Sequence, residues 1–352
     1  MISGWPRPRR DGCGWCRSAE RRYGRETMFQ AKRPLFIYCL SPVHMGAGTA
    51  LGLIDNPIQR ERHTGHPMMA GSGLKGAVRH HAWSQLPEGQ RRNGAASMLH
   101  RIFGPDSGNA DDHAGALSFG DAQLVCFPVR CLKRSFVYAT SATALARARR
   151  GLAAAGVAAW SELSVGDNTA RAASDATLDN GKLLLEAFDY QAQVDEGLRA
   201  VAEWLAEHAL PAAPEYHYFR NKLKSDLVLL PDEDFNHFVR NATVVEPHVR
   251  IDDVSGTADD GRLFYTENLP PESLLLSLVM ATVERRKKGA NGNGLMSAEK
   301  VLAKAVAGWT IEGDGDRKVR GLADALLQVG GDATTGRGLV ALHFAGGESH
   351  DQ

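Results

Sequence analysis

The sequence has little cysteine and no long apolar run. Its five cysteines include one CxxC pair, Cys13 and Cys16, and no second CxxC or CxxH follows to complete a zinc shell. An odd number of cysteines favours a reducing compartment over a disulfide framework. No apolar segment approaches the roughly 20 residues that cross a bilayer, and no apolar signal-peptide core follows the Arg-rich N-terminus. These absences favour a cytoplasmic protein without a membrane partner.

The sequence also lacks an excess of charge of either sign. Lys+Arg and Asp+Glu both number 41, so any argument for a nucleic-acid partner must rest on local clusters. The length of 352 residues and the 43% hydrophobic content suit one large domain or two modest ones. Residues 1–27 are rich in Arg, Gly and Pro with little periodicity. We predict that they form a disordered extension, or that they precede a true start at Met28.

The segment from Ser41 to Arg79 carries the densest set of functional candidates. A β-prone run, Leu35–Leu40, leads into a loop rich in Gly, Pro, His and charge. Helical spacing of apolar residues then predicts a helix over about 73–86, with Ser72 as its cap. Loops between rigid elements are where binding and chemistry concentrate.

The rest of the chain mixes strands and helices without regular βαβ alternation, which favours an α+β fold over a doubly wound sheet. The runs 244–251 and 262–265 flank the turn-rich segment DDVSGTADDG and predict a long exposed hairpin. Apolar patterning predicts a short helix within 227–241 and another helix over 319–328. A last strand is predicted over 339–344.

Two glycine loops are candidate phosphate sites. The first, Gly71-Ser-Gly-Leu-Lys-Gly76, has Lys75 and Arg79 beside it and could bind an anion through backbone N–H groups. It is not a Walker A motif, because Gly76 follows the lysine. The second spans 330–338. Either loop could equally be a tight turn, but the pair favours contact with a polyphosphate backbone.

Asp55 is an isolated acid among basic and small residues in the first of these segments. It could be a general base or a ligand for a hard divalent cation, although Asp-Asn-Pro is also a common turn. His44 could orient or protonate a phosphate, or be a structural histidine at a strand end. Arg60, Arg62 and His63 form a basic patch that either binds phosphate or is simply solvated. No Ser/His/Asp or Cys/His constellation can be assigned.

Taken in order from about Pro34 to Phe344, five blocks resemble the RAMP superfamily. Within it, they are most similar to the backbone subunits of Cmr (type III-B) CRISPR effector complexes. The blocks are HMGAGTALGLIDNPIQRERHTGHPMMAGSGLKGAVR, FGPD at 103–106, GALSFGDAQLVCFPVR, HVRIDDVSGTADDGRLFYTENLP and QVGGDATTGRGLV. One block would be weak, whereas five in sequence are specific.

The resemblance implies a single domain over 28–352. Its fold would be a modified ferredoxin-like (RRM-like) palm with inserted helices, and a β-hairpin thumb at about 243–269. It also implies that copies of the chain assemble along a CRISPR guide RNA with other Cmr subunits. Such a filament would cleave complementary target RNA at regular intervals. Base pairing would then read the sequence, which suits a protein without net charge.

The resemblance also implies roles for individual residues. Asp55 falls on an aspartate needed for cleavage with a divalent cation, Mg²⁺ or Mn²⁺, and is a candidate metal ligand. The remaining RNA contacts are assigned to His44, Arg60, Arg62, Ser72, Lys75, Arg79, Arg250, Gly330, Gly331, Gly336, Arg337 and Gly338. Ala70 and Gly73 depart from the family, which usually has Pro and Ser there. Two rival hypotheses stay open: a structural RNA-binding subunit that does not cleave, and a CRISPR-RNA processing nuclease with His44 as base.

Overall fold

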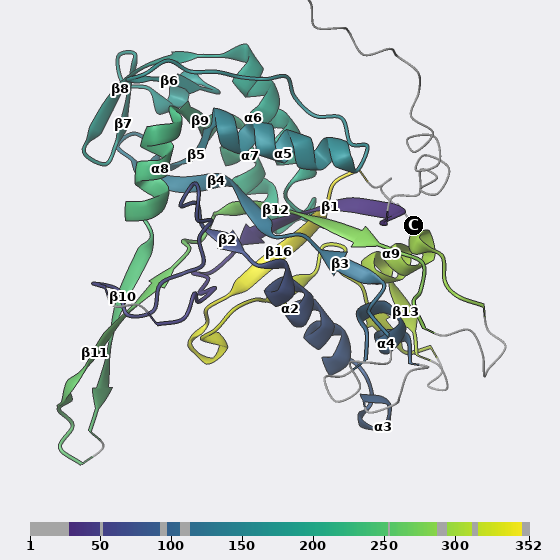
Figure 1. Ribbon diagram of the computed structural model, residues 1–352. Coiled ribbons are helices and arrows are strands. Elements are labelled where there is room, and N and C mark those ends of the chain that lie inside the picture. The colour runs from purple at the N-terminus through teal and green to yellow at the C-terminus, as the bar shows by residue number, and fades with distance from the viewer. Residues whose placement is uncertain are drawn as a thin grey trace, which may run out of the picture.

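A computed structural model describes residues 28–49, 52–91, 97–105, 113–252, 254–286, 294–311 and 316–346 (Figure 1). The predictions made for residues 1–27 lie outside these ranges, as does the last residue of the FGPD block. Within them, no helix is long and apolar enough to cross a membrane. The predicted mixture of helices and strands without βαβ alternation is confirmed.

A central antiparallel sheet is built around β1 (Ala31–Cys39). Its second half is buried on both faces. Its backbone N–H and C=O groups therefore cannot reach water and need a neighbouring strand on each edge. These neighbours are β12 (Leu274–Ala281) and β16 (Leu339–Phe344), which confirms the last strand predicted from the sequence. Further strands extend the sheet, namely β15 (Leu326–Gln328) beyond β16, β3 (Leu117–Phe119) and β4 (Ala122–Cys131) beside β12, and β2 (Met68–Met69) beside β4.

Strand β4 continues out of this sheet into a closed, barrel-like ring of six strands. The order is β4, β5 (Ser135–Ser141), β9 (Leu227–Leu230), β6 (Thr169–Ala172), β8 (Phe188–Val194) and β7 (Lys182–Leu185). A pairing between Cys131 of β4 and Leu185 of β7 closes it. Two of its pairings, β5–β9 and β6–β8, are parallel, and the others are antiparallel.

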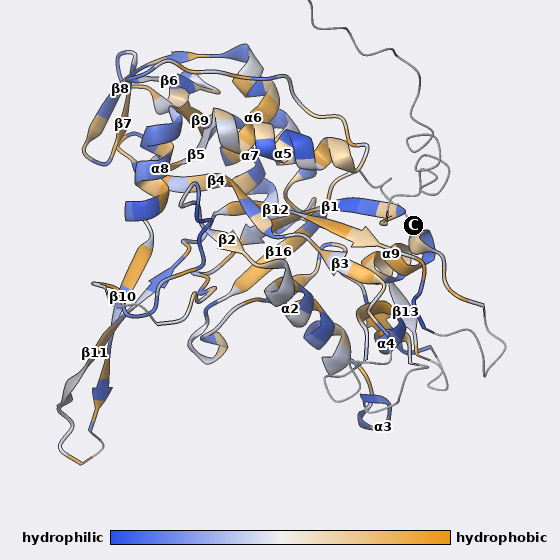
Figure 2. Cartoon of the chain, viewed as in Figure 1, coloured by the Kyte–Doolittle hydropathy of each residue, from blue (hydrophilic) through white to orange (hydrophobic). Residues whose placement is uncertain are grey.

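Helices cover both faces of the sheet because β1 alternates its side chains between two cores. Phe36 and Tyr38 belong to the core under α5 (Ala142–Ala154), α6 (Glu196–His208) and α7 (His217–Asp226). Leu35 and Ile37 belong to the core that receives α2 (Gly71–Ser84), α4 (Met98–Phe103), α8 (Asp232–Asn241) and α9 (Ala298–Ala307). Figure 2 shows apolar residues along β12 and β16 and polar ones on the outer faces of the helices.

A two-stranded hairpin projects from this body, as Figure 1 shows. It is formed by β10 (Val244–Ile251) and β11 (Ala258–Asn268), over the residues where the sequence predicts a hairpin. The remaining elements are short. They are α3 (Glu88–Arg91), β13 (Gly308–Thr310), β14 (Lys318–Arg320) and the 3₁₀ turns η2 (Asp175–Thr177), η3 (Pro214–Tyr216) and η4 (Ala333–Thr335).

The predicted helix over 319–328 is wrong, because this segment forms β14 and β15. A Cβ at Gly321 would lie 2.1 Å from the carbonyl oxygen of Val306, so the chain needs glycine for a close backbone approach. The short helix predicted within 227–241 is confirmed by α8, which follows Pro231. The fully buried strand β9, which the first four residues of this segment form, was not predicted. Burial on both faces favours a strand at Leu227–Leu230.

The predicted start of α2 also needs correction. Its N-cap is Ala70 and makes no side-chain cap bond, so Ser72 is not the cap. Instead, the N–H of Gly71 donates to Oδ1 of Asp121 at 2.8 Å. The carboxylate of Asp121, just before β4, therefore occupies the helix N-terminus at which the sequence predicts a phosphate.

Candidate functional site

The loop after β1 folds back onto one edge of β11. Val43 forms an antiparallel bridge with Leu269, and Asn56 forms a parallel bridge with Thr266. The opposite edge of β11 pairs with β10. Two parts of the loop that are a dozen residues apart are therefore fixed along the same strand.

Asp55 is held by this edge of β11. Its Oδ2 accepts a hydrogen bond from the backbone N–H of Tyr265 at 2.7 Å, and its side chain is half-buried. The neighbouring Asn56 N–H donates to the Tyr265 carbonyl at 3.0 Å. Among the described residues, no hydrogen bond involves Oδ1 of Asp55, so one carboxylate oxygen stays available for a ligand or a proton.

His44 lies along the same edge. Its Nδ1 is 2.7 Å from the carbonyl oxygen of Glu267, two residues after Tyr265. Because a carbonyl can only accept, Nδ1 must carry the proton, and in the neutral ring Nε2 is the acceptor. A Cβ at Gly46 would lie 2.9 Å from Nε2, so glycine leaves room beside this nitrogen. The arrangement presents a basic nitrogen and a carboxylate oxygen at neighbouring positions of one strand.

Glu267 holds these parts together, and the sequence analysis did not identify it. Its side chain is almost fully buried, and both carboxylate oxygens are used. Arg60 Nη2 and Thr243 Oγ1 donate to Oε1 at 2.5 and 2.8 Å, and the Ile58 N–H donates to Oε2 at 3.1 Å. One acid thus joins the Asp55 loop to the start of the hairpin. The sequence predicts an exposed hairpin here, and nothing in its pattern indicates that one acid of this hairpin is buried.

The C-terminal glycine loop packs against the same loop. The Gly331 N–H donates to the carbonyl of His44 at 3.0 Å, and the Gly338 N–H donates to the carbonyl of Pro42 at 2.8 Å. Gly330 has a φ of +83°, and a Cβ there would lie 2.3 Å from the His44 oxygen. Gly336 also has a positive φ, and a Cβ there would meet nothing within 4 Å. The loop is therefore both a packed turn and an accessible backbone surface.

Arg337 of this loop pairs with the base of the hairpin. Its guanidinium donates to both carboxylate oxygens of Glu246 on β10, with Nη2–Oε1 at 2.6 Å and Nε–Oε2 at 3.1 Å. Both side chains stay about a quarter exposed. In the free protein, this predicted RNA contact is engaged by an acid of the same chain.

The first predicted glycine loop is not a loop, because Gly71–Gly76 forms the first turns of α2. This glycine segment contacts the site through Met45. A Cβ at Gly73 would meet the Met45 methyl at 3.2 Å, and one at Gly330 would meet its sulfur at 3.2 Å. Ser72 is exposed on the first turn of α2 and Lys75 is half-buried on the next. Burial, and then the charges of Arg285 and Arg79, lower the pKa of Lys75. A cation in such surroundings favours an added anion.

The three remaining arginines differ in their surroundings. Arg60 Nη1 donates to the carbonyls of Gly65 and Val239, both at 2.8 Å, so its guanidinium is occupied inside the protein. Arg62 is exposed in the turn at 62–64. Arg250 is exposed on β10, four residues and about 13 Å along the strand beyond Glu246. Of the three, only Arg60 contacts Glu267, which holds the loop of Asp55 and His44.

A second buried pair supports the loop from the helical side. Glu61 accepts hydrogen bonds from Arg147 of α5 and from the hydroxyl of Thr64. Burial alone would raise the pKa of Glu61, but these donors hold it below its usual value. The carboxylate therefore stays charged and fixes the loop to α5.

The family model described as the RAMP superfamily matches residues 36–341. This chain belongs to the RAMP superfamily. Among curated relatives, the CRISPR system Cmr endoribonuclease Cmr4 of Pyrococcus furiosus is 34% identical over 307 residues. That alignment covers 86% of this chain and 92% of the relative.

Solved structures agree with this membership. A crystal structure of oligomeric Cmr4 from Pyrococcus furiosus has a TM-score of 0.62 and 27% identity, covering 91% of this RAMP chain and 98% of that chain. A cryo-EM structure of the type III-B Cmr-beta complex bound to cognate target RNA has a TM-score of 0.63 at 18% identity, covering 90% and 98%. The second supports the fold alone.

In the described part of this RAMP chain, no group of three or more His, Cys, Asp and Glu side chains is placed to hold a metal ion. The oxygens of Glu267 are already occupied, which leaves Asp55 as the one predicted ligand. One free carboxylate oxygen fits a hydrated Mg²⁺ or Mn²⁺ held mainly through substrate phosphates, and does not fit an ion enclosed by protein.

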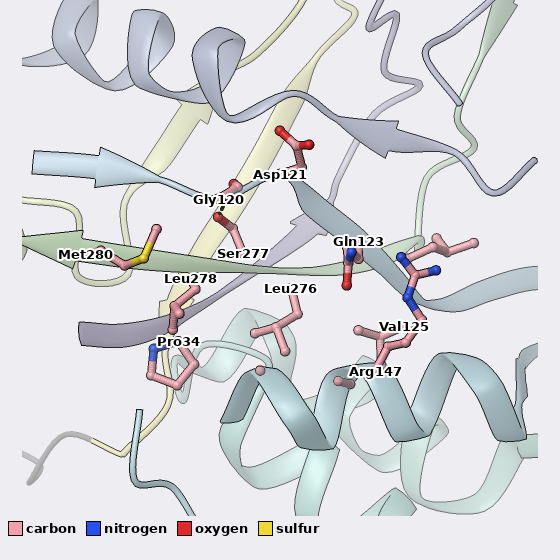
Figure 3. Close-up of a pocket in the computed structure, with 13 residues that line it drawn as sticks. Pro34, Gly120, Asp121, Gln123, Val125, Arg147, Leu276, Ser277, Leu278 and Met280 are labelled. Atoms are coloured by element: carbon pink, nitrogen blue, oxygen red, sulfur yellow. Dashed lines mark hydrogen bonds between the residues drawn. The ribbon is translucent and has the colours of Figure 1, made fainter. Parts of the chain in front are cut away.

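One cavity beside the sheet is separate from these residues. Figure 3 shows it between α5 and strands β4 and β12, with Asp121, Gln123, Ser277 and Arg147 among its lining residues. Its volume is about 320 Å³. None of the predicted RNA-contacting residues lines it.

Proposed function

We propose that this RAMP protein is a backbone subunit of a type III-B CRISPR effector complex. It binds guide RNA together with further copies of itself and other Cmr subunits, and it cleaves complementary target RNA at regular intervals. The observation that carries the proposal is that Asp55 and His44 are hydrogen-bonded to Tyr265 and Glu267, two residues apart on β11. The name of the 34% identical relative, an endoribonuclease, supports the same reaction.

Guide binding is assigned to the C-terminal glycine loop and to the first turns of α2, which the first glycine segment forms. The exposed Ser72, the half-buried Lys75 with Arg79, and the open backbone at Gly336 offer donors and charge to a phosphate chain. Arg337 joins them when a phosphate replaces Glu246 as its partner. These groups read backbone and not bases, as expected where base pairing supplies specificity.

Cleavage needs few protein groups because RNA carries its own nucleophile, the 2′-hydroxyl. The chain must hold one nucleotide in line and move a proton from that oxygen. Nε2 of His44 and the free oxygen of Asp55 are the candidate acceptors. A divalent cation beside Asp55 would stabilise charge on the phosphate. In this assignment the core is a ferredoxin-like palm, the β10–β11 hairpin is the thumb, and the protein works in the cytoplasm.

The proposal is tested with the full chain assembled with guide RNA and its partner subunits. We expect complementary RNA to be cut at evenly spaced positions, and noncomplementary RNA to stay intact. Omission of Mg²⁺ and Mn²⁺ should stop cleavage without releasing the target. Cutting of precursor guide RNA by the lone chain without metal would instead support a processing nuclease.

Gly76→Ala is expected to separate stability from guide binding. Gly76 is exposed within α2, and a Cβ there meets nothing within 4 Å, so alanine should stabilise the free protein by about 0.5–1 kcal/mol. Guide affinity should fall, because the methyl group blocks close approach of a backbone. Urea unfolding and guide-RNA titration measure the two effects. Gly151→Ala in α5, also a helical glycine without a close clash, should leave guide affinity unchanged.

A further inference from the structure

Three side chains stack at the C-terminal end of α2, beyond the residues assigned to guide binding. The His80 and Trp83 rings lie 5.5 Å apart between centroids with an interplanar angle of 25°. The guanidinium carbon of Arg91 lies 4.7 Å from the centroid of Trp83. This stack is named the α2 stack below. It has no part in the function proposed above.

The α2 stack is fixed by the protein around it. Arg91 Nε donates to the carbonyl of Leu86 at 2.9 Å, and its Nη2 donates to the carbonyl of Ser84 at 3.1 Å. Trp83 is partly buried against the main core. His80 is exposed, so it forms the outer surface of the stack. A preformed ring with one accessible side loses little side-chain entropy when a planar group binds to it.

The surroundings of the stack are mainly basic. The Arg320 backbone N–H donates to Oε1 of Gln85 at 2.9 Å, which places β14 beside the end of α2. Burial, and then the charges of Arg320 and His80, lower the pKa of His81. Aromatic side chains within a cationic surface are the usual composition of single-strand nucleic-acid sites.

The stack also continues the guide-binding row of α2. Lys75, Arg79 and Trp83 recur every four residues and so lie along one side of the helix. At 1.5 Å per residue, Trp83 is about 6 Å beyond Arg79 along the axis. An RNA strand with phosphates at Lys75 and Arg79 would reach the stack with its next nucleotide.

We propose that the α2 stack is a platform on which one base of the guide strand stacks, next to the segment held by Lys75 and Arg79. The inference rests on the proposed guide binding and adds to it a contact with a base. Stacking on the exposed face of His80 is tolerant of sequence, because every base has a π-face. It would fix the position of the guide along α2 without reading its sequence.

The test compares His80→Ala, His80→Phe and Arg79→Ala in the full chain, with single-stranded RNA of guide length. His80→Ala should weaken binding about tenfold, and His80→Phe should restore it. The slope of log affinity against log salt should stay unchanged for both. Arg79→Ala should reduce the magnitude of that slope by about 0.7, as the loss of one phosphate contact to a single strand predicts.

A set of guides with one abasic nucleotide at successive positions locates the contact. At one position, the abasic guide should bind wild type about tenfold more weakly, and His80→Ala should then cause no further loss. Unchanged affinity in His80→Ala, with a lowered unfolding midpoint, would show that the stack only stabilises the end of α2. That result would leave the guide-binding proposal intact if Arg79→Ala still weakens RNA binding. If both His80→Ala and Arg79→Ala bind RNA as tightly as wild type, both proposals are wrong.

Discussion

Asp55→Asn is expected to reduce target cleavage by about 10²- to 10⁴-fold, the usual contribution of a positioned acid or base. Asparagine can still accept the hydrogen bond from Tyr265 through its amide oxygen, so the loop should keep its place on β11. Only the charge and the proton-accepting oxygen are lost. Guide and target binding should therefore match wild type, and single-turnover cleavage of complementary RNA by the assembled complex measures the effect.

The control for Asp55 is Asp175→Asn, which removes one negative charge from an exposed residue in η2. It should cleave at the wild-type rate. If Asp55→Asn cuts normally and His44→Ala does not, proton transfer belongs to His44 and Asp55 is only a turn residue. If both variants cut normally, the chain is a structural subunit and its partners perform the chemistry.

Glu267→Gln is expected to have the largest effect on stability. The carboxylate accepts from Arg60, Thr243 and Ile58 in a nearly dry position. The amide nitrogen would replace one oxygen and would set its N–H groups against the donors of that oxygen. Breaking a buried ion pair on one side costs about 3–5 kcal/mol, since the remaining charge is left without compensation. We expect a loss of that order in urea unfolding, together with weaker cleavage because Asp55 and His44 lose their common support.

Glu246→Gln is the matched control on the same hairpin. It also removes a carboxylate paired with an arginine, but Glu246 and Arg337 are both about a quarter exposed. Exposed pairs contribute roughly 0–1 kcal/mol, so this variant should unfold within that range of wild type. Equal losses in the two variants would mean that Glu267 is no more important to the hairpin base than a surface acid.

The sequence predicted the parts of this fold that depend on local pattern. The apolar run at Leu35, the helix after Gly71 and the hairpin around DDVSGTADDG all have strong period or turn signals, and each element forms. The strand β9 was missed because Leu227–Leu230 is buried on both faces, and such a run cannot be distinguished from a helix by periodicity. The helix predicted around Gly321 does not form, because the shape of this segment depends on close packing against a carbonyl from α9.

For the candidate site, the sequence predicted side chains but not their connections. Asp55 and His44 were identifiable as isolated polar residues in a glycine-rich loop. Glu267 was not, because its importance arises from partners supplied by three distant segments. Arg60 and Arg337 have the composition of phosphate contacts, yet both are paired with acids of this chain, and no local pattern reports a partner about 200 or 90 residues away.

The hydrogen bond between Asp55 and Tyr265 can form only late in the synthesis of the chain. These residues are 210 positions apart. At about 5–20 residues per second, a ribosome adds Tyr265 roughly ten to forty seconds after Asp55. Until then, the acid has no strand to hold it and the histidine has no carbonyl to fix its tautomer. A nascent chain, or one truncated before the hairpin, thus lacks the arrangement assigned to cleavage and cannot cut cellular RNA through it.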